Sequence, residues 1–307
     1  MTAIDETTIN RLSATAAAFP RHEQTFPTLT AHEIERMRRF GEPRSYKDGE
    51  ALFETGTPGP GMFVVLSGSV AITQRDGLGR VTPVIDQGPG QFLAEIGQLS
   101  GRAALVDGHA DGAVETLLLP PDRLRALLVA EADLGERIMR ALILRRVSLI
   151  QGGAGGPVLI GPSNSARVAG LQNFLTRNSF PHHLLDPESD GDAAARYSPT
   201  RAELPLVVCP NGTVLRNPSE TALAMALGMI GNSAQDRLYD VAVVGSGPAG
   251  LSTAVYAASE GLSVAVFDSR AFGGQAGASM RIENYLGFPT GITGQALAGR
   301  AFNQAQK

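Results

Sequence analysis

One stretch near the end of the chain constrains its fold more than any other, the thirteen residues YDVAVVGSGPAGL at Tyr239–Leu251. An apolar run is followed by a Gly-x-Gly-x-x-Gly turn and then by residues that favour a helix. This order is typical of the first strand, turn and helix of a dinucleotide-binding unit. A second apolar run, 262–267, ends at Asp268, 23 residues after Gly245. A carboxylate at about that spacing binds the ribose in such units, so the sequence predicts a dinucleotide site here.

Each glycine of the turn meets a separate geometric demand. Gly245 allows the tight turn after the strand, Gly247 lets the backbone approach a pyrophosphate, and Gly250 lets the helix pack closely on the strand. The helix start also offers free amides and a positive dipole end to the phosphates. The alternative is an ordinary glycine turn. The predicted phosphate-binding residues are Gly245, Ser246, Gly247, Pro248, Ala249 and Gly250.

Length and composition set further bounds. The chain has 307 residues, a formal net charge of -4 and a sequence pI near 5.8, which gives no basic field to attract nucleic acid. Cys209 is the only cysteine, so no disulfide, CxxC pair or cysteine-rich metal site is expected within this span, and we expect no metal. No basic segment with an apolar run marks a secretory signal, and no run reaches the ~18 apolar residues of a membrane helix. We therefore expect a cytoplasmic protein of two or three domains.

The N-terminal part reads as a domain at 1–150. Short alternating apolar runs recur between Arg44 and Leu119, interrupted by Gly, Pro and Asp turns, which predicts a small β-barrel or jelly roll. Pro121 then begins a helical region, because Pro is favoured at the first helical position. A second, long amphipathic helix is predicted over 133–150, with Asp133 as its cap.

A glycine linker at 152–156 separates this part from a second predicted domain at 156–231. There, β-α-β and β-β-α patterns follow one another within 80 residues, which predicts a small α+β fold. The third predicted domain, 238–307, begins the dinucleotide unit. Only 57 residues follow Gly250, and a complete unit needs further strands and helices, so we expect the chain to stop inside this domain.

Further motifs in the third domain resemble the FAD domain of bacterial thioredoxin reductases. They are Gly-Gly-Gln at 273–275, Ile-Glu-Asn-Tyr-Leu-Gly-Phe-Pro at 282–289 and Gly-Ile-Thr-Gly at 291–294. The resemblance implies a Rossmann-like α/β domain in which Gly245–Gly250 and Asp268 bind the ADP half of FAD. It places Gly273, Gly274, Gln275 and Asn284 along the flavin. The alternatives are a flexible loop for the two glycines and a turn or capping role for Asn284. Asp268 departs from the Glu that relatives often carry.

The same resemblance implies the chemistry. Hydride passes from NADPH to the flavin, and electrons then pass to a disulfide or another acceptor, such as a thioredoxin-like protein. The NADPH site and the CxxC pair of that family would lie beyond Lys307, and some relatives lack the pair. We therefore expect no catalytic residue within this span.

The N-terminal barrel resembles a cyclic-nucleotide-binding domain. The match includes Asp-Gly-Glu at 48–50, the run 63–70 and the cassette 90–104. The resemblance implies that Arg102 pairs with the cyclic phosphate of cyclic AMP or cyclic GMP, that Glu95 accepts from the ribose, and that Ala103 and Ala104 donate backbone N–H groups. Ala94 stands where the family usually has Gly, and the interval from Glu95 to Arg102 is shorter than usual. The alternative is that Glu95 and Arg102 form an internal structural ion pair.

The predicted helix 133–150 corresponds to the C-terminal helix of that family, often a dimer element, so we expect a homodimer. The alternative is a helix simply packed on the barrel. A glycine linker and a strand follow this helix, where transcription factors of the family have a helix-turn-helix, so DNA binding is not expected.

The middle domain resembles a thioredoxin- or glutaredoxin-type fold, on its element order, on Leu204-Pro205 before a strand and on the Asn211-Gly212 hairpin. The loop 161–166, where that family has its redox cysteines, has no thiol, so an adaptor or docking role is expected. Pro205 would be the family's cis-proline, and Cys209 reads as an inert core residue.

The leading interpretation is a multidomain, regulated flavoprotein oxidoreductase of the thioredoxin-reductase type. Ligand bound at Arg102 would move the helix 133–150, and the linker would pass that change on. One alternative is a non-catalytic cyclic-nucleotide-binding module with an adaptor domain. Another is a flavoprotein that passes electrons to a different protein partner.

Overall fold

The structure is a computed structural model of the chain. It describes residues 21–94, 99, 101–151, 155–188, 197, 200–230 and 238–307. The chain forms two compact units. The first comprises Met1–Gly161, Pro181–Asn217 and Ala226–Gly228, and the second comprises Pro162–Phe180, Pro218–Met225 and Met229–Lys307. The three domain boundaries predicted from the sequence remain predictions.

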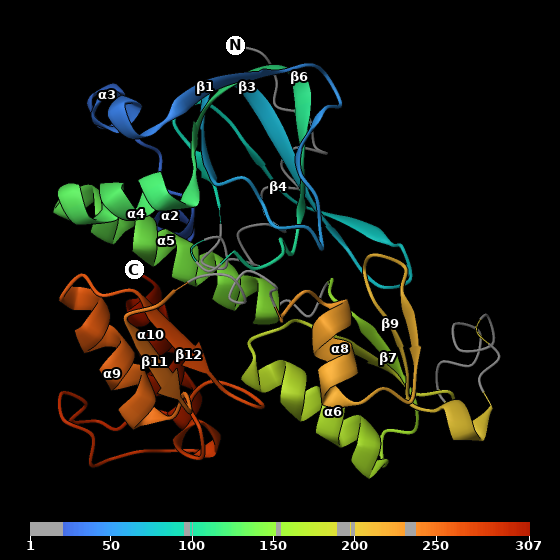
Figure 1. Ribbon diagram of the computed structural model, residues 1–307. Helices are drawn as coiled ribbons and strands as arrows, with labels where there is room; N and C mark the ends of the chain where they lie inside the picture. Colours follow the sequence, from blue (N-terminus) through green and yellow to red (C-terminus); the bar gives the residue numbers. More distant parts are fainter. Residues whose placement is uncertain are drawn as a thin grey trace. The chain divides into compact units, whose positions relative to one another are not determined.

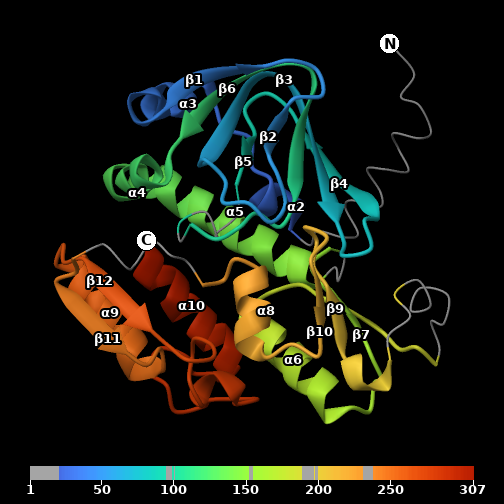
Figure 2. The ribbon, with the colours of Figure 1, turned by 45° about the vertical axis from the view of Figure 1, so that its right-hand side comes forward.

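The first unit contains the predicted barrel (Figure 1, Figure 2). Its six-stranded antiparallel sheet has the order β1-β6-β3-β4, with β2 on β6 and β5 on β3. The strands are β1 (Glu42–Tyr46), β2 (Ala51–Phe53), β3 (Met62–Arg75), β4 (Val81–Gln87), β5 (Phe92–Leu93) and β6 (Asp107–Leu119). The helices are α2 (His22–Thr25), α3 (Ala31–Met37), the 3-10 helix η1 (Arg38–Phe40), α4 (Pro121–Ala130) and α5 (Ala132–Gln151). The β-barrel/jelly-roll prediction is confirmed.

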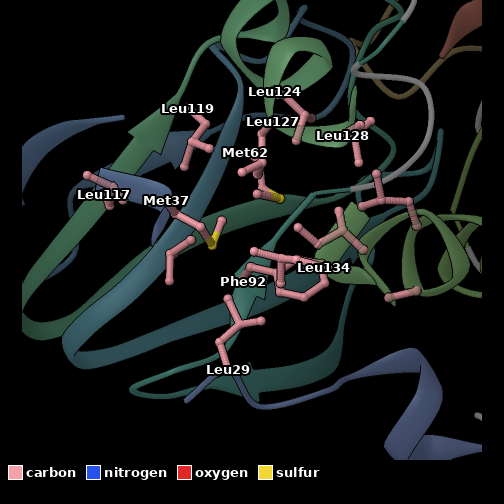
Figure 3. Close-up of a cluster of buried hydrophobic side chains, with 14 of the residues drawn as sticks. Leu29, Met37, Met62, Phe92, Leu117, Leu119, Leu124, Leu127, Leu128 and Leu134 are labelled. Atoms are coloured by element: carbon pink, nitrogen blue, oxygen red, sulfur yellow. The ribbon is translucent and has the colours of Figure 1, made fainter. Parts of the chain in front are cut away.

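The core explains why β3 begins with an unbroken apolar run. Alternate residues of a strand point to opposite faces, and here both faces are buried. Met62 and Val64 join a cluster that α3, α4 and α5 complete, shown in Figure 3. Phe63 and Val65 join a second cluster with residues of β2, β5 and β6. Such a strand reads as continuously apolar instead of alternating.

Helix α5 packs along the barrel with its apolar stripe. Leu134, Ile138 and Leu142 are fully buried in the same cluster as Met62. The apolar face from which a homodimer was expected is thus covered, over these residues, by the chain's own barrel. The dimer remains a prediction.

The predicted cap of α5 is wrong by two residues, because the N-cap of a helix that begins at Ala132 is residue 131. The helix begins at Ala132, so Asp133 lies in its first turn. The Asp133 carboxylate pairs with Arg36 of α3 at 2.8 Å, and this bond lowers its pKa to about 2. The Asp133 side chain therefore binds Arg36 of another helix, although the local sequence pattern predicted that it caps α5.

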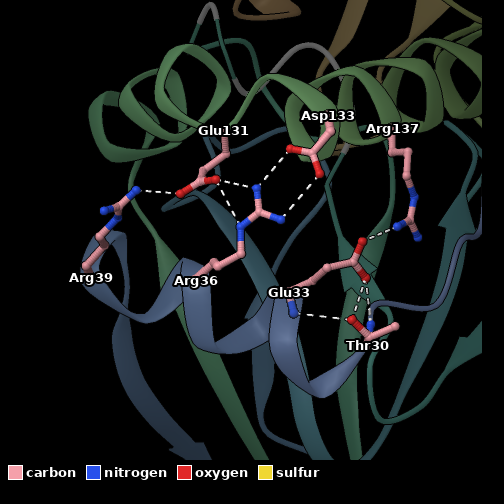
Figure 4. Close-up of polar contacts among 7 residues, drawn as sticks. All are labelled: Thr30, Glu33, Arg36, Arg39, Glu131, Asp133 and Arg137. Atoms are coloured by element: carbon pink, nitrogen blue, oxygen red, sulfur yellow. Dashed lines mark hydrogen bonds and ion pairs between the residues drawn. The ribbon is translucent and has the colours of Figure 1, made fainter.

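The ion pair belongs to a polar cluster that holds α3 against the α4–α5 junction (Figure 4). Arg36 also pairs with Glu131, as does Arg39, and Arg137 of α5 pairs with Glu33. Thr30 and Glu33 form a capping box at the start of α3. Burial raises the pKa of Glu33, but the Thr30 and Arg137 contacts outweigh it, so the net shift is downward.

The first unit also holds a four-stranded sheet with the order β10-β9-β7-β8. Its strands are β7 (Val158–Ile160), β8 (His183–Leu185), β9 (Leu206–Val208) and β10 (Val214–Arg216). Strands β7 and β8 are parallel, and the other two pairs are antiparallel. The Leu204–Pro205 peptide bond is cis, as predicted. The sheet agrees with the thioredoxin-like α+β prediction.

The turn between β3 and β4 touches this sheet. The backbone N–H of Gly77 donates to the Gly156 carbonyl at 3.1 Å. A Cβ on Gly77 would lie 2.0 Å from the Val208 carbonyl oxygen, so only glycine allows this approach. The β3–β4 hairpin of the barrel is therefore in backbone contact with the second sheet.

The second unit contains the predicted strand, turn and helix. Its elements are α6 (Ala166–Arg177), α8 (Glu220–Ala226), β11 (Val241–Val244), α9 (Pro248–Ser259), β12 (Val264–Phe267), the 3-10 helix η5 (Ala276–Ala278) and α10 (Gly294–Gln306). Strands β11 and β12 pair in parallel, with Val241 opposite Val264. The start of a Rossmann-like unit is confirmed. Val244 is 90% exposed and Phe267 51% exposed at the ends of these strands.

Cys209 is fully buried directly after β9, and burial raises the pKa of its thiol to about 11. This agrees with the prediction of an inert core residue. No group of His, Cys, Asp or Glu side chains suited to a metal ion occurs among the described residues. Among the helices that the structure describes, none is long and apolar enough to cross a bilayer.

Candidate flavin site and barrel cassette

The glycine turn has the geometry that the sequence predicts. Strand β11 ends at Val244, and Gly245 turns the chain with φ +93°. Gly247 is the N-cap of α9, and Pro248 takes the first helical position. A Cβ on Gly250 would lie 1.8 Å from the Gly245 carbonyl oxygen. The helix start can therefore lie this close to the strand end only with glycine at position 250.

The second glycine pair lies against the first turn. The Gly273 N–H donates to the Ser246 carbonyl at 2.7 Å. A Cβ on Gly274 would come within 3.0 Å of the Gly247 Cα. Both residues have positive φ, +95° and +54°. The fold thus brings together residues of the two motifs that are 27 positions apart in the sequence.

Asp268 lies beside the turn, but its carboxylate binds the protein itself. Its Oδ2 accepts from the backbone N–H and the hydroxyl of Ser246, both at 2.8 Å. Its Oδ1 accepts from the N–H groups of Arg270 and Ala271 at 2.9 and 3.2 Å. Burial raises the pKa of Asp268, but these bonds outweigh it and the net shift is downward. A carboxylate has about four acceptor sites, so a ribose hydroxyl would have to replace one of these donors.

Gln275 and Asn284 are both exposed. Gln275 precedes the short helix η5. Asn284 lies in a turn that Ile282 and Ile292 close through two backbone hydrogen bonds of 2.7 and 3.0 Å. Tyr285, the next residue, lines a small apolar cavity of about 20 Å³ together with Pro248 and Gly273. The segment therefore lies near the glycine turn, while the roles of Gln275 and Asn284 stay predictions.

Residues at the end of α6 also bind the loop 270–274, which is predicted to lie along the flavin. The sequence analysis did not predict these contacts. Arg177 donates through Nη2 to the Gly274 carbonyl at 2.6 Å, and the Asn178 amide donates to the Arg270 carbonyl at 3.0 Å. Gln295 of α10 donates to the Thr176 carbonyl at 2.9 Å. The Arg177-Asn178 pair ends a predicted helix, which gave no signal of contacts about 95 positions away. Glu220 of α8 adds a two-pronged ion pair with Arg270.

The residues present fit the pyrophosphate of FAD. The first amides of α9 lack partners within the helix, as at every helix start, and the adjoining glycines leave no Cβ in the way. Residues Gly245–Gly250 would hold the phosphates, and Gly273 and Gly274 would lie next to them. The cradle is built by close backbone contacts that side chains other than hydrogen would break.

The barrel cassette is partly described. Glu95 lies outside the described residues. Ala103 is buried and pairs with Pro58, and Arg102 is half-buried. The N–H of Ala104 donates to the Thr57 carbonyl at 2.9 Å, and the phosphate-binding role of this residue remains a prediction. The backbone pairing that closes the barrel uses the donor.

Comparison with known proteins finds matches for two separate regions of the chain. Residues 43–131 match the family described as cyclic nucleotide-binding domain, and residues 240–289 match the family described as FAD dependent oxidoreductase. The bifunctional thioredoxin reductase/thioredoxin of Mycobacterium leprae (strain TN) is 44% identical over 73 residues, which are 24% of this chain and 16% of that protein. Thioredoxin reductase of Mycolicibacterium smegmatis is 42% identical over 73 residues, 24% of each chain.

Thioredoxin reductase of Bacillus subtilis (strain 168) is 37% identical over 73 residues, 24% of this chain and 23% of that one. The chain thus spans about a quarter or less of these curated relatives. A solved structure described as "A cyclic-GMP-dependent signalling pathway regulates bacterial phytopathogenesis" is 29% identical, covers 39% of this chain and 95% of its own, and has a TM-score of 0.34. The chain therefore joins a cyclic nucleotide-binding domain to a segment of an FAD-dependent oxidoreductase domain that is homologous to thioredoxin reductases.

Proposed function

We propose that this chain belongs to a regulated FAD-dependent oxidoreductase of the thioredoxin-reductase type. One observation supports the proposal: the two motifs predicted to bind FAD, the Gly245–Gly250 turn and the Gly273–Gly274 loop, are joined by a backbone hydrogen bond of 2.7 Å from Gly273 to Ser246. The share of the relatives that the chain covers leaves the whole activity as a proposal.

The chain's own residues would bind and orient the cofactor. Amides at the start of α9 bind the pyrophosphate, and the Ser246 hydroxyl can turn away from Asp268 to free one carboxylate oxygen for a ribose hydroxyl. Arg177 fixes the Gly274 loop beside the flavin. When bound, FAD supplies the hydride chemistry, taking a hydride from NADPH and passing two electrons on.

The relatives support a proposal for the electron acceptor. Several are thioredoxin reductases, so we assign a disulfide of a thioredoxin-like protein as the acceptor class and NADPH as the donor. We further propose a cytoplasmic homodimer that binds neither DNA nor membrane. The middle domain, whose loop 161–166 has no thiol, would serve as a docking domain.

The barrel would regulate this activity by binding a small ligand. Helix α5 is the supporting element, because it spans 20 residues and packs on the barrel core along its length. A ligand that binds one position of α5 more tightly than another would shift the enzyme between two states. The size of the effect cannot exceed the difference in affinity.

The experiment is spectroscopy of the complete protein, purified after incubation with FAD. We expect the visible absorption of oxidised flavin, and its bleaching by NADPH without oxygen. Adding a thioredoxin disulfide should restore the absorption. A protein that stays colourless contradicts the proposal and favours a non-catalytic ligand-binding protein. A protein that is bleached but not reoxidised by thioredoxin places the electrons on a different partner.

A further inference from the structure

The turn between β3 and β4, residues 76–80, contacts the sheet β10-β9-β7-β8 through a side chain as well as through backbone. Leu78 of this turn is half-buried and packs against the apolar cluster of that sheet. The cluster comprises Val158, Ile160, Leu185, Leu206 and Val208. Turn and sheet belong to the same compact unit. A residue of the barrel therefore contributes to the hydrophobic core of the predicted middle domain.

The position of this leucine in the sequence is unusual for a hairpin. Residues 76–79 read Asp-Gly-Leu-Gly, so a large apolar side chain lies at the tip of a turn, where small and polar residues are favoured. In an isolated barrel this side chain would lie in water and contribute nothing to the core. Its contact with the second sheet removes it from water and gives it a packing partner.

The turn that carries Leu78 is fixed by its own hydrogen bonds. Oδ1 of Asp76 accepts from the backbone N–H groups of Leu78 and Arg80, both at 2.9 Å. The Asp76 N–H donates to the Arg80 carbonyl at 3.1 Å, and the Gly79 N–H donates to the Asp76 carbonyl at 3.0 Å. These bonds are internal to the turn, so the turn is preorganised to dock on the sheet.

The two glycines that end the predicted linker are packed as well. The Gly156 carbonyl, which accepts from Gly77, belongs to a residue with φ +73°, and a Cβ at Gly156 would overlap the Pro181 carbonyl. Gly155 has φ +81°, and a Cβ there would overlap the side chain of Gln74 in β3. Both positions therefore require glycine for close packing, in a segment whose composition predicts flexibility.

We propose that the β3–β4 turn is a docking element of the barrel for the middle sheet, and that the Leu78 contact keeps this sheet closed. Undocking of the turn would then loosen β7 and β9 as well as the turn itself, so the stability of the middle sheet depends on the barrel. The inference concerns packing within the first compact unit and stands independently of flavin activity.

Cys209 reports on the packing of the middle sheet, because it directly follows β9 and is fully buried. A thiol in this position reacts with a disulfide reagent only when the sheet opens. The assay is the rate of Cys209 labelling in the complete protein, at urea concentrations below the unfolding transition. Mass spectrometry of the peptide that contains Cys209 follows the reaction, so other thiols do not interfere.

Leu78→Ala removes the side-chain contact and leaves the hydrogen bonds of the turn in place. We expect Cys209 labelling to become about tenfold faster, because the lost apolar contact shifts the equilibrium toward the open sheet. Val81→Ala is the matched control, since Val81 lies in the same hairpin and is 51% exposed, and its labelling rate should stay unchanged. Equal rates in the two variants would overturn the proposal.

A second pair of variants tests the backbone approach. In Gly77→Ala the new Cβ would overlap the Val208 carbonyl, so labelling should again become faster. Gly88→Ala, at the other end of β4, adds a Cβ that meets no atom within 4 Å and should have no effect. An unchanged rate in Gly77→Ala would refute the close approach of turn and sheet.

If Leu78→Ala does not fold, hydrogen exchange of the unaltered protein decides. The Gly77 N–H, which donates across the contact to Gly156, and the amides of β7 should show the same protection, because one opening exposes both. Protection of the β7 amides that exceeds that of Gly77 by more than about tenfold would show that the turn undocks without loosening the sheet, and would overturn the proposal.

Discussion

Gly250→Ala tests the predicted flavin site. Helix propensity alone predicts a more stable helix, whereas the close approach to Gly245 predicts a displaced helix start and a loss of FAD affinity. Position 250 lies in the first turn of α9, where alanine is the better helix former by about 0.8–1 kcal/mol. In this structure, however, the new Cβ would lie 1.8 Å from the Gly245 carbonyl oxygen and 3.2 Å from Val243 Cγ1. The carbonyl belongs to backbone, so no side chain can turn aside to make room.

The distance by which the helix start must move determines the expected loss of FAD affinity. The two atoms must separate from 1.8 Å to at least the 3.4 Å of an ordinary contact, which moves the helix start away from the turn. The amides predicted to bind the pyrophosphate move with it. A misplacement of about 1 Å at such a site can cost roughly 100-fold, or about 2.7 kcal/mol, which exceeds the gain in helix propensity.

The assay is titration of the complete apoprotein with FAD, followed by quenching of flavin fluorescence. We expect at least a 100-fold loss of affinity in Gly250→Ala. Gly299→Ala is the matched control, since Gly299 lies inside α10 and a Cβ added there would meet no atom within 4 Å, so its affinity should stay unchanged. If Gly250→Ala binds FAD as tightly as the parent, the close approach at Gly245 has no part in binding and the reasoning fails.

Three further predictions concern other contacts. Arg177→Met removes the hydrogen bond to Gly274, so FAD affinity should fall about tenfold while ligand binding by the barrel is unchanged. An unaltered FAD affinity would show that this hydrogen bond has no part in FAD binding. Cys209, buried with its thiol pKa raised to about 11, should not react with a disulfide reagent at pH 8 until urea is added, and rapid labelling of the folded protein would refute its burial. Because Arg36 lowers the pKa of Asp133 to about 2, the stabilisation from that pair is present above the ordinary Asp pKa of 3.8 and is lost as pH falls through about 2. The melting temperature should thus fall more between pH 4 and pH 2 in the parent than in Asp133→Asn, and equal slopes would show that the pair contributes nothing.

Local patterns predicted much of the fold. Turn residues and alternating apolar runs located the barrel strands, and the proline at the first position of α4 marked its start correctly. The glycine turn could be predicted from the sequence because local backbone geometry requires glycine at each of its three glycine positions. Asp133 shows the limit: its chemistry suits a cap, but Arg36, 97 positions away, determined where its carboxylate lies.

The site residues that were missed share one property, dependence on distant partners. Arg177 and Asn178 end an ordinary amphipathic helix, and only the folded chain brings the 270–274 loop to them. Arg145 did leave a trace in the sequence. It falls three residues after Leu142 and four before Leu149, on the apolar stripe of α5, where a charged residue is out of place. A charge in that register predicts a buried charged side chain, and Arg145 is buried and donates to the carbonyls of Thr25, Phe92 and Ala94.

The backbone contact between Gly77 and Gly156 has a mechanical consequence. Strand β4 supplies Val84, Ile85 and Gln87 to the lining of a cavity inside the barrel, and the turn at its other end abuts β7 and β9. A displacement of β4 would therefore also move the turn that contacts the neighbouring sheet. The contact would thus connect the barrel to the neighbouring sheet by a route that does not include α5.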